Sequence, residues 1–93
     1  MNEPPDLDAR PVLAAGVRLQ TDRLTGEPLL LSSEGIHVLN ETSSAIVARC
    51  DGSATIGQIL VSLAAEYDAS ADELRADVLE CLRDLRARRL IAT

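Results

Sequence analysis

The spacing of apolar residues changes at Asn40, and this change limits the fold more than any other feature of the sequence. In residues 17–22 apolar and polar side chains alternate, with Val17, Leu19 and Thr21 on one side. That period of two is typical of a half-buried strand. After Asn40 the apolar residues recur every three or four positions, which is the period of a helix. The chain is therefore expected to build an α+β fold, with its strands first and its helices last.

Three short strands are predicted before Asn40. They cover residues 17–22, 28–32 and 36–39, each an apolar or alternating run. Gly26 lies in the turn between the first two strands, and residues 33–35 form the next turn. Strands that are joined by such short turns pair with their neighbours, so we expect a three-stranded antiparallel meander.

Three helices are predicted after the meander, and each has a capping residue at its start. The caps are Asn40, Thr55 and Ser70, and the last two open capping boxes with Gln and Glu three residues later. Residues 51–52, Asp-Gly, end the first helix, and residues 90–93 are expected to form a short tail. The predicted spans are 41 to about 50, 55 onward, and 70 to about 88. Two helices around a tight turn, with a third helix and a small sheet, predict a winged-helix-like architecture.

The length and net charge of the chain limit its number of domains and its possible partners. Ninety-three residues make one domain, expected over residues 11–93, after a flexible, acidic and proline-rich tail over residues 1–10. The net charge of −6 counts against nucleic acid as the main partner, because phosphate contacts need a basic face. A winged-helix DNA-binding regulator nevertheless stays open as an alternative function. Without a membrane-spanning apolar run or a start like a signal peptide, the protein is expected to be cytoplasmic.

The sequence offers little for catalysis or metal binding. Its single histidine, His37, has no partner for a triad or a metal site, and by alternation it points away from Ile36 and Val38. We expect it on the surface beside a sheet edge, with a ligand contact as the alternative. Cys50 and Cys81 lie on apolar helical positions and are predicted to be free, core-packing thiols. No catalytic residue, cofactor or metal ligand is therefore predicted, and the protein is not expected to be an enzyme.

One stripe of the last predicted helix suggests a binding surface. Its members stand at i, i+4, i+7 and i+11, namely Arg75, Leu79, Leu82 and Arg86. Leu79 lies off the main apolar arc of this helix, so it either packs under the sheet or a loop, or forms the wall of a groove. In the second case the stripe would be apolar in the middle and basic at both ends, which suits an acidic amphipathic peptide.

Residues 10–91 resemble the coenzyme PQQ synthesis protein D (PqqD) family. The motifs that carry the resemblance are Glu34-Gly35, Leu39-Asn40-x-Thr42, Asp51-Gly52, Tyr67-Asp68, and Asp77-Val78 followed by Leu82 and Leu85. The chain departs from the family in its poverty of aromatic residues, since Tyr67 is the only one.

The resemblance implies a small winged-helix-like domain that recognises a ribosomally made precursor peptide, PqqA. The domain would present the peptide to the radical S-adenosylmethionine enzyme PqqE, without being the catalyst itself. In this family the peptide is held as an added strand on the third strand's edge, against the last helix. The peptide-binding residues expected here are Gly35, Ile36, His37, Val38, Leu39, Arg75, Leu79, Leu82 and Arg86. A recognition domain of another modified-peptide pathway is the alternative.

The arginine-rich end of the last helix is the predicted surface for the enzyme. Arg83, Arg88 and Arg89 concentrate positive charge in an otherwise acidic protein. An adaptor must hold the peptide and the enzyme at once, so this surface is expected not to overlap the peptide site. No nucleic acid or membrane partner is expected, and the chain is expected to be a monomer or a weak homodimer.

Overall fold

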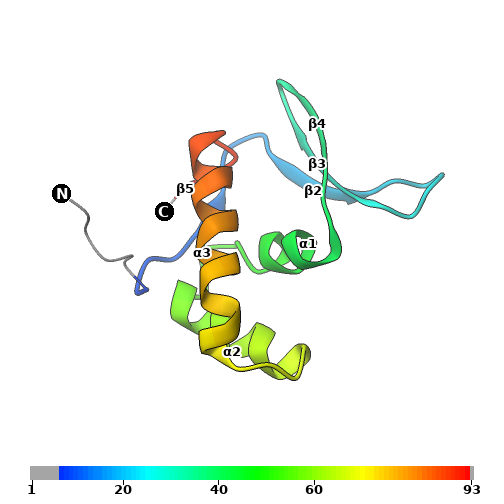
Figure 1. Cartoon of the computed structure of the whole chain (residues 1–93). Coiled ribbons are helices and arrows are strands. Elements are labelled where there is room, and N and C mark those ends of the chain that lie inside the picture. Colours follow the sequence, from blue (N-terminus) through cyan, green and yellow to red (C-terminus); the bar gives the residue numbers. More distant parts are fainter. Residues whose placement is uncertain (1–6, 93) are drawn as a thin grey trace.

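A computed structural model describes residues 7–92 of the chain. Its elements follow the predicted order of strands and then helices, so the α+β meander with three following helices is confirmed. The elements are β1 (Val12–Leu13), β2 (Arg18–Thr21), β3 (Pro28–Ser32), β4 (Gly35–Val38), α1 (Glu41–Ala48), α2 (Ile56–Glu66), α3 (Ala71–Ala87) and β5 (Ile91–Ala92). Figure 1 shows α3 upright beside α1 and α2, with the β2-β3-β4 sheet extending to one side.

The main sheet has the order β2-β3-β4 and is antiparallel throughout. Leu30 stands at its centre, opposite Leu19 on β2 and His37 on β4. The two tight turns use glycines at positive φ: Gly26 at 77° and Gly35 at 145°. At these values a side chain would strain the backbone, so both turns depend on glycine.

The predicted helix starts are confirmed in their hydrogen bonding. The side chains of Asn40, Thr55 and Ser70 accept bonds from the backbone N–H three residues later. At Thr55 the Gln58 side chain also returns to the cap N–H, which completes the capping box. Each cap provides a partner for an N–H group that the helix itself leaves unpaired, and so fixes where the helix begins.

A second, two-stranded sheet was not predicted. β1 pairs with β5, Val12 opposite Ala92 and Leu13 opposite Ile91, so residues 90–93 are not merely a tail. Leu90 and Ile91 are buried in the core. Strands of two residues are too short to show an alternation, which is why the sequence gives no signal for them.

Of the predicted N-terminal tail, residues 7–10 belong to the described chain. Leu7 and Ala9 lie against the core, and their carbonyls accept bonds from the N–H groups of Gly57 and Ile56 at 3.0 and 2.9 Å. These bonds satisfy N–H groups in the first turn of α2. The other six residues of the predicted tail, 1–6, lie outside the described part.

The core is aliphatic and joins the main sheet to all three helices. Its members include Leu30, Ile46, Ile59, Leu63, Val78, Leu82 and Leu85, all at most 5% exposed. On α3 the side chains of Val78, Leu82 and Leu85 are buried, whereas Leu74 and Cys81 are half-buried. None of the helices between residues 7 and 92 is long and apolar enough to cross a membrane.

Candidate functional site

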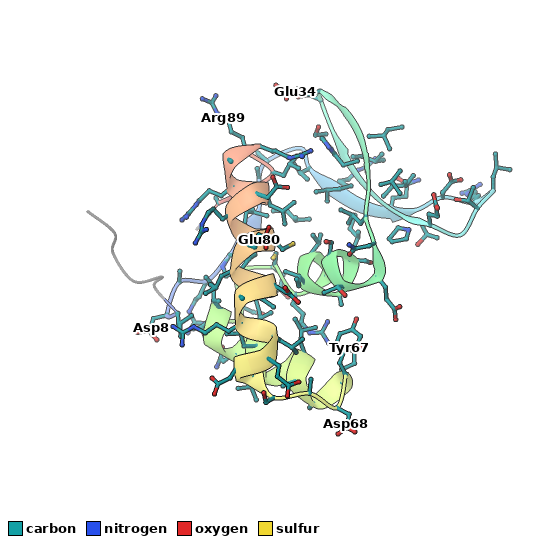
Figure 2. The ribbon with its side chains drawn as sticks, in the orientation of Figure 1. Asp8, Glu34, Tyr67, Asp68, Glu80 and Arg89 are labelled. Atoms are coloured by element: carbon teal, nitrogen blue, oxygen red, sulfur yellow. The ribbon has the colours of Figure 1, made fainter. Side chains whose placement is uncertain are left out.

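A groove of about 810 Å³ lies between β4, the start of α1 and the C-terminal half of α3. Its apolar floor is formed by Ile46, Leu85 and Leu90. β4 and the residue after it contribute His37, Val38 and Leu39 to one wall. The opposite wall belongs to α3, and Figure 2 shows Glu80 midway along that helix.

β4 forms an edge of the main sheet, and its outer backbone groups are unpaired in the described chain. Leu39 N–H donates to Pro28 O at 3.0 Å, which makes these two a hydrogen-bonded pair in the β3–β4 register. Such pairs alternate along an antiparallel ladder, so His37 also bonds to β3. The N–H and C=O groups of Ile36 and Val38 then point away from β3, at the open edge. The site therefore combines a free strand edge with a groove beside it.

The side chains of β4 face the opposite way to the one expected: His37 is turned inward, and Ile36 and Val38 are turned outward. His37 faces the same side as Leu30, which is fully buried; His37 is half-buried and lines the groove. Ile36 and Val38 are 66% and 63% exposed. The expectation of a surface histidine is thus corrected, because the register of β4 against Leu30 turns the histidine inward.

The predicted stripe of α3 does not line the groove. Leu82 is buried in the core, and Leu79 is half-buried and packs against it. Arg75 and Arg86 are exposed on other faces of the helix, outside the residues that line the groove. Of the nine predicted peptide-binding residues, His37, Val38 and Leu39 line the groove, while Gly35 and Ile36 lie beside them on β4. Their role in peptide binding stays a prediction.

The α3 wall of the groove instead starts two residues after the predicted stripe. It comprises Asp77, Glu80, Cys81, Arg83, Asp84, Ala87 and Arg88. Three carboxylates and two guanidinium groups stand along it, and Arg88 Nε lies 3.2 Å from Asp84 Oδ2. The wall is mixed in charge, so it does not specifically favour an acidic peptide as the arginine stripe would have done.

Two of the three arginines in the predicted enzyme surface line the groove. Arg83 and Arg88 belong to the groove lining, so they do not form a surface separate from it. Arg89 lies beyond the end of α3 at a φ of 60°, and together with Arg88 it lines a smaller cavity at the loop around Gly16. Figure 2 shows it at the helix end opposite the one nearest Asp68.

The two cysteines are free thiols, as predicted, but only Cys50 is fully buried in the core. Cys50 is 2% exposed, and its burial raises the pKa of the thiol to about 12. Cys81 is half-buried at the groove, where its Sγ donates to Ser43 Oγ over 3.7 Å. Burial also raises the pKa of Cys81, although the hydrogen bond with Ser43 opposes the rise. Both thiols are therefore protonated near neutral pH and are poor nucleophiles.

Residues 7–92 contain no group of three or more His, Cys, Asp or Glu side chains that could hold a metal ion. What the site offers is a row of backbone donors and acceptors next to a partly apolar groove. Such an arrangement can take up an extended chain by main-chain pairing and hold its alternate side chains in the groove.

Comparisons with known proteins agree with this geometry. The family model for coenzyme PQQ synthesis protein D (PqqD) matches residues 27–91. The chain is 42% identical over 84 residues to the PqqA binding protein of Xanthomonas oryzae pv. oryzae (strain KACC10331 / KXO85), covering 90% of this chain and 91% of that protein. It is 40% identical over 84 residues to the PqqA binding protein of Xanthomonas campestris pv. campestris (strain 8004), with the same coverage.

Two solved structures are similar. One is the solution structure of the PqqD truncation of Methylobacterium extorquens PqqCD, described as a stand-alone RiPP recognition element, with a TM-score of 0.77 and 32% identity. It covers 89% of this chain and 88% of that chain. The other is the crystal structure of PqqD from Xanthomonas campestris, with a TM-score of 0.60 and 38% identity, covering 97% of this chain and 100% of that one.

Proposed function

The chain belongs to the coenzyme PQQ synthesis protein D (PqqD) family, and on that basis we propose that it binds the precursor peptide PqqA and presents it to PqqE. The observation that carries the proposal is the unpaired edge of β4 beside the groove. Relatives that are named PqqA binding proteins and a neighbour described as a RiPP recognition element support it.

The peptide pairs with β4 as a fourth strand of the main sheet. Its backbone bonds to the N–H and C=O groups of Ile36 and Val38, which β3 leaves unpaired. Residues of the peptide that stand opposite His37 and Leu39 direct their side chains into the groove, over Ile46. Main-chain bonds thus provide affinity, and the groove provides selectivity for alternate side chains.

The chain acts as an adaptor and leaves the chemistry to the enzyme. Its groove contains one histidine and one cysteine, and the pKa of that Cys81 thiol is raised. Binding to a strand edge holds a peptide extended, which keeps its remaining residues accessible to a second protein. PqqE, a radical S-adenosylmethionine enzyme, is the second protein that we propose.

Titration of 15N-labelled protein with synthetic PqqA tests the site. We expect the largest amide shifts at Ile36 and Val38 on β4 and at Cys81 on α3. Val61, which is 66% exposed on α2 and does not line the groove, is the internal control. Largest shifts over residues 56–66 would place the peptide elsewhere. Binding of random DNA duplex but not PqqA would favour a DNA-binding regulator, and binding only of other precursor peptides would favour a different peptide pathway.

A further inference from the structure

The outer face of the main sheet carries aliphatic side chains in a contiguous group, which we call the outer patch. Residues directly opposite each other on paired strands share a face, and Leu31 lies opposite Ile36 while Leu29 lies opposite Val38. All four therefore stand on the face away from the buried Leu30. The outer patch comprises Leu29, Leu31, Ile36 and Val38.

Half of this patch is open to solvent in the described chain, whereas Leu29 and Leu31 on β3 are half-buried. Ile36 and Val38 remain 66% and 63% exposed. An antiparallel sheet with one buried face usually places polar residues on the other. Here only β2 does so, through Arg18 and Gln20 at the border of the patch. Contiguous exposed apolar side chains of this kind mark interaction sites.

The outer patch is continuous with the groove. Val38 belongs to both, and Ile36 and Val38 supply the unpaired backbone groups of the strand edge. A peptide strand that is added to this edge alternates its side chains like any other strand. Those opposite His37 point into the groove, whereas those opposite Ile36 and Val38 stand next to the outer patch. Peptide binding therefore enlarges the patch with side chains of the peptide itself.

We propose that the outer patch and the outward side chains of the bound peptide together form the docking surface for the enzyme that modifies the peptide. The inference rests on the proposed function and names the surface that the enzyme recognises. Its partner surface is apolar, with an acidic or polar acceptor facing Arg18. Unlike Arg83 and Arg88, which line the groove, Leu31 and Ile36 lie outside the groove lining. The enzyme and the groove-facing side chains of the peptide can therefore be held at once.

The size of the patch explains why the peptide is needed. Four aliphatic side chains, two of them half-buried, do not supply the roughly 800 Å² that each partner contributes to a stable interface. The enzyme should thus bind the protein alone weakly and the protein–peptide complex more tightly. By linkage, the enzyme should tighten peptide binding by the same factor.

The test uses the double variant Leu29→Thr/Leu31→Thr, because both residues belong to the outer patch on β3 and not to the peptide-binding edge. Threonine keeps strand propensity while removing apolar surface. Leu24→Thr is the matched control, since Leu24 is 95% exposed in the turn between β2 and β3, away from the patch. Affinities for PqqA and for PqqE are measured by calorimetry, the latter with and without saturating PqqA. Circular dichroism and thermal unfolding check the fold, and the single variant Leu31→Thr replaces the double variant if that does not fold.

We expect PqqA to raise the affinity of the unsubstituted protein for PqqE at least fivefold. The double variant should lose tenfold or more in PqqE affinity while its PqqA affinity stays within about twofold. Leu24→Thr should change neither. Unchanged PqqE affinity in the folded variant would overturn the inference. A dimer in sedimentation velocity that the variant abolishes would assign the patch to a second copy and overturn it as well. Failure of the unsubstituted protein to bind PqqA would instead refute the proposed function, on which the inference depends.

Discussion

Replacing Ile36 by proline should block peptide binding at the strand edge without unfolding the sheet. The Ile36 N–H points away from β3, so proline removes no bond of the existing ladder. The preceding residue, Gly35, has no Cβ to collide with the proline ring. The same substitution at His37 would remove an N–H that bonds to β3, and should destabilise the protein. The two variants therefore distinguish the two sides of one strand.

The size of the effect follows from the hydrogen bonds at stake. A net protein hydrogen bond is worth about 0.5–1.5 kcal/mol, so loss of the Ile36 bond alone weakens binding roughly fivefold. The proline ring also occupies the space into which a peptide carbonyl would point, and so weakens the neighbouring bond at Val38. Together these losses amount to about 1–3 kcal/mol, on the order of 5–150-fold in Kd.

Calorimetric titration with PqqA measures the change, and Ile36→Thr is the matched control because it removes the same side chain but keeps the N–H. We expect Ile36→Thr to bind within about twofold of the unsubstituted protein and Ile36→Pro to bind far more weakly. Equal affinities for the two variants, with both folded by circular dichroism, would refute pairing of the peptide with β4.

Three further outcomes are expected. Bound PqqA should slow alkylation of Cys81 by iodoacetamide at least fivefold, because Cys81 lines the groove. Mass spectrometry of the labelled thiols measures this rate. Cys50, which is buried, should stay unlabelled with or without peptide. Leu79→Glu should lower the unfolding free energy by about 1–3 kcal/mol in denaturant titrations, since Leu79 packs on the core, and the folded variant should still bind PqqA. The unfolding free energy should fall as the pH rises from 9 to 12, because the unfolded Cys50 thiol ionises near 9.0 whereas its folded pKa is about 12. The Cys50→Ala variant should flatten this pH dependence. An equally steep pH dependence in that variant would show that another group causes it.

The change of periodicity at Asn40 and the capping residues were sufficient to predict the order of the main elements. Capping residues can be recognised in the sequence because their hydrogen bonds are local. Thr55 and Gln58, for example, bond to each other's backbone within one turn. The β1–β5 pair is not local, since it joins residues nearly eighty positions apart. Only the burial of Leu90 and Ile91 against the core fixes it, and that depends on the finished tertiary structure.

The position of the groove along β4 was predictable, but the face of α3 that lines it was not. A helix turns by about 100° per residue, so an offset of two positions moves a stripe to a different side. The apolar residues of α3 mark the face that contacts the core, and Leu82 and Leu79 follow that contact. A groove that is open to solvent is lined by residues such as Asp77 and Asp84, which from sequence resemble any exposed helix face.

The orientation of β4 could not be derived from its own residues for a related reason. Alternation shows which residues share a face, but not which face is buried, and Leu29, Leu30 and Leu31 on β3 are apolar on both sides. The contact between β3 and α1 buries Leu30 and so determines which face of the sheet points inward. Pairing with β3 then turns His37 inward and Ile36 outward. Exposing two aliphatic residues on an edge strand is costly for an isolated domain and favours aggregation. The arrangement is consistent with a sheet whose edge and outer face both work in contact with partners, the peptide on one and the enzyme on the other.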